Sequence, residues 1–175
     1  EAESMPVLDI GNAQGCDVQP VAFTHGTGQL FWHGIQEQGE ELKLAFTLAE
    51  AYRGDFQIGV CMAADYGKFQ FSIDGKEIGG PVDTYQPALM RADYLSLGQV
   101  ELSTGEHVLT VKNVGKNDLS AGYLLGLDTI RIYHGQPQSG CIEGEDLTVN
   151  FIGGAGGFQT KTWKGHRLMV FDGGE

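Results

Sequence analysis

The sequence predicts an all-β protein: a two-sheet antiparallel jelly-roll β-sandwich, followed by the start of a second similar unit. Three observations predict it. The chain has 27 glycines among 175 residues, which indicates frequent turns. Apolar and polar residues alternate in short runs, and no long apolar helix pattern occurs. Half-buried alternation with short connections favours antiparallel sheets, and two such sheets bury their apolar faces by packing together.

Period-two alternation locates the individual strands. It is clearest from Glu41 to Leu48, where every second residue from Leu42 onward is apolar. Asp74-Gly75 is a strong hairpin-turn signal, and Thr104-Gly105 indicates a second turn. The predicted strands are 41–48, 56–62, 69–73, 76–78, 95–102, 107–114 and 123–133.

An internal repeat predicts the domain organisation. The opening 1–7 is matched by 143–149, and each copy continues through glycine, glutamine and an aromatic residue into a short apolar strand. We therefore expect one complete unit at 1–134, a linker at 135–141 and a truncated second copy at 142–175.

The truncated copy would lack most of its strands, and an unpaired strand edge recruits another strand. We expect 142–175 to pair with the first unit, with downstream sequence or with a second chain. The alternative is that this tail adds an edge to the first sandwich and the repeat is fortuitous.

Composition restricts the partners and the chemistry. A net charge of −12 disfavours nucleic acids and anionic membranes, and no apolar stretch approaches the roughly 20 residues of a membrane span. Cys16, Cys61 and Cys141 lack CxxC spacing, which leaves free thiols or one disulfide open. No GxSxG, HExxH or phosphate-loop motif occurs, so we expect no enzyme activity. A glycosidase-like pair of acids is the remaining alternative.

Three stretches carry a family resemblance: Glu1-Ala2-Glu3, the loop and strand from Asp65 to Gly75, and the ending from Gly126 to Ile132. Together they resemble the galactose-binding-like β-sandwich superfamily, in particular carbohydrate-binding modules of families 6 and 35 and accessory domains of bacterial polysaccharide-degrading proteins. The resemblance implies a non-catalytic carbohydrate-binding module of a larger secreted or cell-surface bacterial protein, with adjacent domains as further partners. The alternative is a structural accessory sandwich that packs against a catalytic domain and binds no free ligand.

A calcium site is expected near the start of the chain. Glu1 and Glu3 would share one face of a strand, and neighbouring carboxylates repel unless a cation lies between them. Ca²⁺ prefers such oxygen ligands. The resemblance implies a structural Ca²⁺ held by Glu1, Glu3 and Asp128; the alternative is an exposed acidic chain end. Glu143 and Glu145 match the same pair in the second copy.

Sugars bind to aromatic faces, with amides and carboxylates on their hydroxyls, and such residues usually lie on loops. Trp32 follows a strand pattern, so packing in the core is its alternative. Tyr66 is expected to be exposed on a loop. The resemblance implies a loop cleft to which Asn117 contributes. The candidate ligand-binding residues are Trp32, His33, Tyr66, Tyr85 and Asn117, with Tyr94 and Tyr123 in addition.

Overall fold

A computed structural model describes residues 1–133 and two further strands at 157–163 and 166–172. The chain divides into two units, Glu1–His134 and Gly135–Glu175, and each is described by itself. The strands of the first unit are β1 Val7–Asp9, β2 Gly15–Gln19, β3 Gln29–His33, β4 Glu41–Leu48, β5 Tyr52–Met62, β6 Gly67–Ile73, β7 Lys76–Asp83, β8 Met90–Arg91, β9 Leu95–Leu102, β10 Gly105–Lys116 and β11 Leu125–Tyr133.

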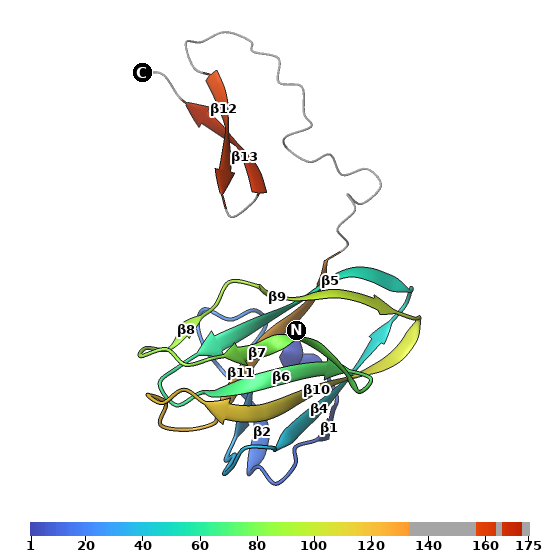
Figure 1. The fold of residues 1–175 in the computed structure, drawn as a ribbon, viewed down its shortest axis with the longest axis vertical. Helices are drawn as coiled ribbons and strands as arrows, with labels where there is room; N and C mark the ends of the chain where they lie inside the picture. The colour runs from blue at the N-terminus through green and yellow to red at the C-terminus, as the bar shows by residue number, and fades with distance from the viewer. Residues whose placement is uncertain (134–156, 164–165, 173–175) are drawn as a thin grey trace. The chain divides into compact units, whose positions relative to one another are not determined.

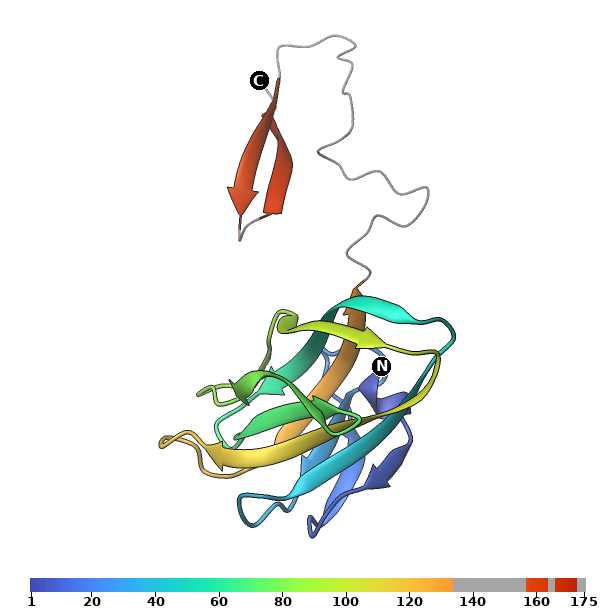
Figure 2. The same ribbon diagram turned by 45° about the vertical axis from the view of Figure 1, so that its right-hand side comes forward.

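These strands form two sheets. Sheet A has the order β1-β4-β10-β6-β7, and sheet B has the order β2-β3-β11-β5-β8, with β9 also paired to β5. All the strand pairs are antiparallel. Figures 1 and 2 show β4, β10 and β6 side by side in one layer, with β5 and β11 in the other. The prediction of an all-β, two-sheet antiparallel sandwich is confirmed.

The core lies between the two sheets and follows the predicted alternation. On β4, Leu42 and Leu44 are fully buried while the alternating residues Glu41 and Lys43 are partly exposed. The same alternation of core-facing and outward-facing residues holds on β6 and β10, although the outward-facing Gln70 of β6 is also buried. The largest fully buried side chains are those of Trp32, Phe56, Phe69 and Phe71.

The elements that the alternation missed are short. Strands β1, β2 and β8 have five residues or fewer, and β1 is an edge strand that leaves Val7 and Leu8 exposed. Residues Ala2–Ser4 form a 3-10 turn, closed by a hydrogen bond from Met5 N to Ala2 O (3.0 Å). The expectation that Glu1 and Glu3 start a strand is therefore wrong.

The cysteines Cys16 and Cys61 form no disulfide among the described residues. Burial, helped by the charge of Asp17, raises the pKa of the Cys16 thiol to about 12. Burial also raises the pKa of Cys61 to about 11. Both are therefore neutral thiols at physiological pH, whereas Cys141 lies outside the described residues.

In the second unit the structure describes one hairpin, β12 Gly157–Trp163 and β13 His166–Asp172, with Gly157 opposite Asp172. The linker at 135–141 and the acids Glu143 and Glu145 lie outside the described residues. That 142–175 begins a second copy and associates with another strand therefore stays a prediction. Within the described ranges no helix is long and apolar enough to cross a membrane.

Trp32 offers a test of the core. Its side chain is 0% exposed, its indole Nε1 donates to Ile10 O (3.2 Å), and its ring lies 6.1 Å from that of Phe69. Replacing Trp32 by phenylalanine leaves a cavity and removes the donor, so we expect the free energy of unfolding to fall by about 2–3 kcal/mol. Urea denaturation measures this. Leu119→Ala is the control, because this side chain is 75% exposed, and it should change the free energy of unfolding by less than about 0.5 kcal/mol. Equal effects of the two variants would contradict the placement of Trp32 in the core.

Candidate functional site

The N-terminus, the β2–β3 loop and the last strand of sheet B meet at a group of ionisable residues. Glu1, His25 and Asp128 each place a potential ligand atom within 4.8 Å of the others. Asp128, on β11, is fully buried and accepts hydrogen bonds from the backbone N (2.8 Å) and ring Nδ1 (2.9 Å) of His25. Arg91 of β8 also donates to it through Nε. Sequence reasoning identified Glu1 and Asp128 but missed His25 and Arg91, which come from distant segments.

Glu3 lies beside this group without belonging to it. Because Ala2–Ser4 is a 3-10 turn, Glu3 is directed to the β2–β3 loop, where its Oε1 accepts from Thr27 N (2.9 Å). Its other oxygen, Oε2, is buried and has no hydrogen-bond partner. Gly26, at φ +59°, makes this approach possible, since a Cβ there would lie 1.9 Å from Glu3 Oε1.

The electrostatics keep Asp128 ionised. Burial by itself raises the pKa of this carboxyl, but the hydrogen bonds from Arg91 and His25 outweigh it, so the pKa lies below its ordinary value. The hydrogen bond with Asp128 also raises the pKa of Arg91, although burial by itself would lower that pKa. Asp128 is therefore a charged, buried acceptor whose negative charge Arg91 balances.

The donor set fits a hard divalent cation. The unpartnered Oε2 of Glu3 lies outside the group, whereas the carboxylates of Glu1 and Asp128 are the oxygen ligands that Ca²⁺ prefers. These residues would hold the ion, which would join the N-terminal turn to β11. It would have to compete with Arg91 for Asp128, and this competition weakens the site relative to three unpaired carboxylates.

Two of the expected sugar-binding aromatics are buried. Trp32 packs in the core between the sheets, and Tyr66 is 3% exposed, with its hydroxyl accepting from Gln29 Nε2 (2.8 Å). Burial raises the pKa of Tyr66 strongly. The expectation that Tyr66 is exposed on a loop is wrong, because the loop after β5 folds this ring back onto sheet B. Neither ring presents a face on which a sugar could stack.

His33 and Tyr66 are nevertheless brought together through Phe31, which sequence reasoning missed. Phe31 stacks on His33 at 5.3 Å between ring centroids and lies 6.2 Å from Tyr66. His33 Nε2 is paired with Asp17 Oδ2 at 2.9 Å. These residues share the outer face of sheet B, because Gly15 and Asp17 of β2 lie opposite His33 and Phe31. The half-exposed rings form a small aromatic group with a carboxylate at its edge.

Tyr85 and Asn117 meet at the loop end of the sandwich through Asp83. Asp83 Oδ2 accepts from Asn117 Nδ2 (2.8 Å) and pairs with Lys68 Nζ (3.4 Å), while its Oδ1 accepts from the backbone N of Tyr85 (3.1 Å). Burial acts to raise the pKa of Asp83, but these bonds lower it overall. Tyr85 also bridges to Ala63. The polar atoms of Asn117 are thus largely used within the protein.

The two remaining tyrosines are each occupied by cations. Arg91 and Arg131 both lie 4.9 Å from the centre of the Tyr94 ring. Lys116 Nζ lies 5.0 Å from the ring centre of Tyr123. Such contacts stabilise the guanidinium or ammonium group over the aromatic face, so these rings are partly covered by side chains of the protein itself.

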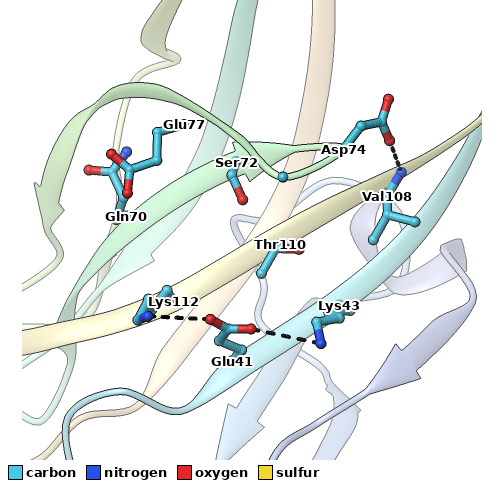
Figure 3. A pocket seen from close by; sticks show the side chains of 10 residues that line it. Glu41, Lys43, Gln70, Ser72, Asp74, Glu77, Val108, Thr110 and Lys112 are labelled. Carbon is cyan, nitrogen blue, oxygen red and sulfur yellow. Dashed lines mark hydrogen bonds and ion pairs between the residues drawn. The ribbon is translucent and has the colours of Figure 1, made fainter.

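A hollow of about 530 Å³ lies on the outer face of sheet A (Figure 3). This volume falls within the roughly 300–1,000 Å³ of small-ligand clefts. Its floor is formed by β4, β10, β6 and β7. The residues that line it are Glu41, Lys43, Gln70, Ser72, Asp74, Gly75, Glu77, Val108, Thr110 and Lys112.

Strand register arranges the polar side chains of this hollow in two rows across the sheet. One row runs Lys43–Thr110–Ser72–Glu77 and the other Glu41–Lys112–Gln70. Glu41 lies between the two lysines, 3.7 Å from Lys43 Nζ and 3.4 Å from Lys112 Nζ (Figure 3). The hollow thus offers hydroxyls, carboxylates and ammonium groups, whereas the Nε2 of Gln70 donates to the backbone oxygens of Phe71 (3.1 Å) and Ile78 (3.0 Å). No sequence pattern indicates this hollow, because outward-facing polar residues look the same on any half-exposed sheet.

No family model matches the chain, and no curated protein matches it. Among solved structures it is similar to a Paenibacillus xanthan lyase, with a TM-score of 0.69 and 22% identity over 75% of this chain and 12% of the lyase. It is also similar to a family 35 carbohydrate-binding module from an environmental isolate, with a TM-score of 0.53 and 15% identity over 77% of this chain and 91% of the module.

These similarities establish the fold. The first unit is a two-sheet antiparallel β-sandwich whose fold is similar to that of a family 35 carbohydrate-binding module. The match to the lyase covers a small part of that protein, which is much longer than this chain.

The cation site gives a direct prediction. A ligand that binds only the folded protein stabilises it by about 2.7 kcal/mol at 100 times its Kd, so Ca²⁺ should raise Tm and a chelator should reverse the rise. Glu1→Gln keeps the size of the side chain but removes the charge of one carboxylate of the group, and should abolish most of the Ca²⁺ effect. Glu37→Gln, at an exposed glutamate, is the matched control. A Tm that does not respond to Ca²⁺ in the unmodified protein would exclude the site.

Proposed function

We propose that the first unit is a non-catalytic carbohydrate-binding module of a larger, secreted carbohydrate-active protein, and that it binds a neutral polysaccharide in the hollow on sheet A. The observation that supports this most is the pair of cross-strand rows, which place hydroxyl, carboxylate and ammonium groups over one open surface. Such groups bond sugar hydroxyls. The names of the similar structures, a xanthan lyase and a family 35 carbohydrate-binding module, agree with a carbohydrate as the ligand.

The preference for a neutral glycan follows from charge. Three carboxylates and two ammonium groups line the hollow, and the chain as a whole carries a net charge of −12. A polyanionic glycan would be repelled during approach, whereas a neutral one would not. Lys43 and Lys112 are already paired with Glu41, so they are not open cation sites for a sugar carboxylate.

No aromatic ring is among the described residues that line the hollow. Binding would therefore rest on hydrogen bonds, each of which contributes only about 0.5–1.5 kcal/mol net. Weak single contacts suit a long polymer, because several neighbouring sugars can bind the two rows at once. The loop end around Asp83 and Asn117 is the competing location, and its polar groups are more fully paired within the protein.

The test is affinity electrophoresis or calorimetry with soluble mannan, xylan and β-glucan, and with a polyuronate for contrast. We expect binding to at least one neutral polymer. The double variant Thr110→Val, Ser72→Ala removes two hydroxyls from one row and should weaken this binding about tenfold. Thr47→Val is the matched control, because Thr47 lies on the same face of β4 but does not line the hollow.

The outcomes separate the alternatives. Loss of binding in Asn117→Ala, with the double variant unaffected, would place the ligand at the loop end instead. Absence of binding to every polymer would overturn the proposal and leave a structural accessory sandwich as the function.

A further inference from the structure

His107 occupies an unusual position at one end of the sandwich. It lies on the core-facing side of β10, opposite Phe46 of β4, and is only 5% exposed. Its ring stacks on Phe46 at 5.4 Å between centroids with an interplanar angle of 30°. A buried histidine needs partners for both ring nitrogens, because an unpaired buried polar atom costs free energy.

Both partners of this ring are hydrogen-bond acceptors. Nδ1 lies 2.7 Å from Asp74 Oδ2, and Nε2 lies 2.8 Å from the backbone oxygen of Ser103. A carbonyl can only accept, so Nε2 carries a hydrogen; a carboxylate likewise only accepts, so Nδ1 carries one as well. Only the doubly protonated imidazolium can therefore donate a hydrogen bond to both acceptors.

Asp74 connects this ring to the hollow. It lies in the β6–β7 turn at φ 50°, the only non-glycine residue with positive φ among those described. Its Oδ1 accepts from Val108 N (2.9 Å), and its own N donates to Val108 O (2.9 Å). Asp74, Gly75 and Val108 line one end of the hollow. The contact with His107 thus ties this rim to the β9–β10 turn, which contains Ser103.

No other ionisable group bonds to the ring among the described residues. The neighbouring strand ends carry the charged residues Lys76 on β7, Glu101 on β9 and Glu106 beside His107 on β10. β4 contributes the aromatic Phe46. The hydrogen bond with Asp74, followed by that with Ser103, raises the pKa of His107 above its ordinary value in spite of burial. Burial raises the pKa of Asp74, but the bonds from His107 and Val108 lower it overall.

We propose that His107 and Asp74 form a pH-dependent lock on the rim of the hollow, closed while the ring carries both protons and opened when Nε2 loses its proton. The carboxylate of Asp74 retains the proton on Nδ1, because a charge-assisted hydrogen bond is stronger than one to a carbonyl. In the open state the Nε2 lone pair would therefore face the carbonyl oxygen of Ser103, so the β9–β10 turn is released from the ring and from the rim. Regulation of glycan binding by this lock rests on the proposed function; the lock itself does not.

The direction of the pH effect follows from linkage. The folded protein holds the His107 proton more tightly than the unfolded chain does, so the stabilisation is complete below the ordinary histidine pKa of about 6.5. It is lost as pH rises through the higher pKa of the folded state. Rising pH therefore opens the lock.

The lock is tested without any glycan. NMR follows the titration of the histidine rings, and His107→Gln assigns the signal of His107. Urea unfolding is measured over about pH 5.5–9, a range that spans the ordinary pKa of histidine. Both measurements are made on the unmodified protein, on His107→Gln and on Asp74→Asn. Asp74→Asn is the matched variant, because asparagine tolerates the left-handed backbone and can still accept from Val108 N. We expect the pKa of His107 to be raised in the unmodified protein and to be lower in Asp74→Asn. We also expect the free energy of unfolding to fall with rising pH in the unmodified protein, and to fall much less in both variants. A His107 that titrates at its ordinary value, or a pH dependence that survives in Asp74→Asn, would overturn the lock.

A second readout addresses regulation. Affinity for the neutral polymer that binds best is measured at the two ends of the same pH range. We expect affinity to fall at high pH in the unmodified protein and to change little in Asp74→Asn. A constant affinity while the ring titrates would overturn regulation and retain the lock. If no polymer binds, the proposed function fails while NMR and unfolding still decide the lock.

Discussion

The register of β10 between β4 and β6 is the constraint on which the rest of the first unit depends. Because side chains alternate along a strand, this register places Leu109 and Val111 in the core and Thr110 and Lys112 over the outer face. A slip of one residue would exchange the two sets and expose the core residues. The same register sets the depth of His107 and the position of Val108 against Asp74. Core, hollow and lock are thus three consequences of one pairing.

The sequence predicted those parts of the fold that depend on local patterns. Strand β4 was predicted with its observed bounds, and the Asp74-Gly75 turn adopts the positive φ angles that the dipeptide favours. Short edge strands such as β1 carry too few residues to show a period. The 3-10 turn that holds Glu3 has no distinctive pattern, and its geometry is decided by contacts with the β2–β3 loop.

Site residues were harder to predict because their roles depend on partners far away in the chain. Trp32 and Tyr66 are aromatic residues of the type that binds sugars, yet tertiary packing buries both. His25 reaches Asp128 from the β2–β3 loop and Arg91 reaches it from β8, and nothing local to either residue indicates that contact. The rows over sheet A required knowledge of which strands are neighbours, since Lys43, Thr110, Ser72 and Glu77 are adjacent only across the sheet.

The floor of the hollow consists of paired strands rather than loops, and this has a thermodynamic consequence. Hydrogen bonding on both sides holds the backbone of β10 and β6, so little conformational entropy remains to be lost when a ligand arrives. Glu41 also restrains the two lysines that flank it. The surface is accordingly preorganised, and association there should proceed as the meeting of nearly rigid bodies. Because the groups involved are polar, the heat-capacity change should be small, which distinguishes this mode of recognition from one based on burying aromatic rings.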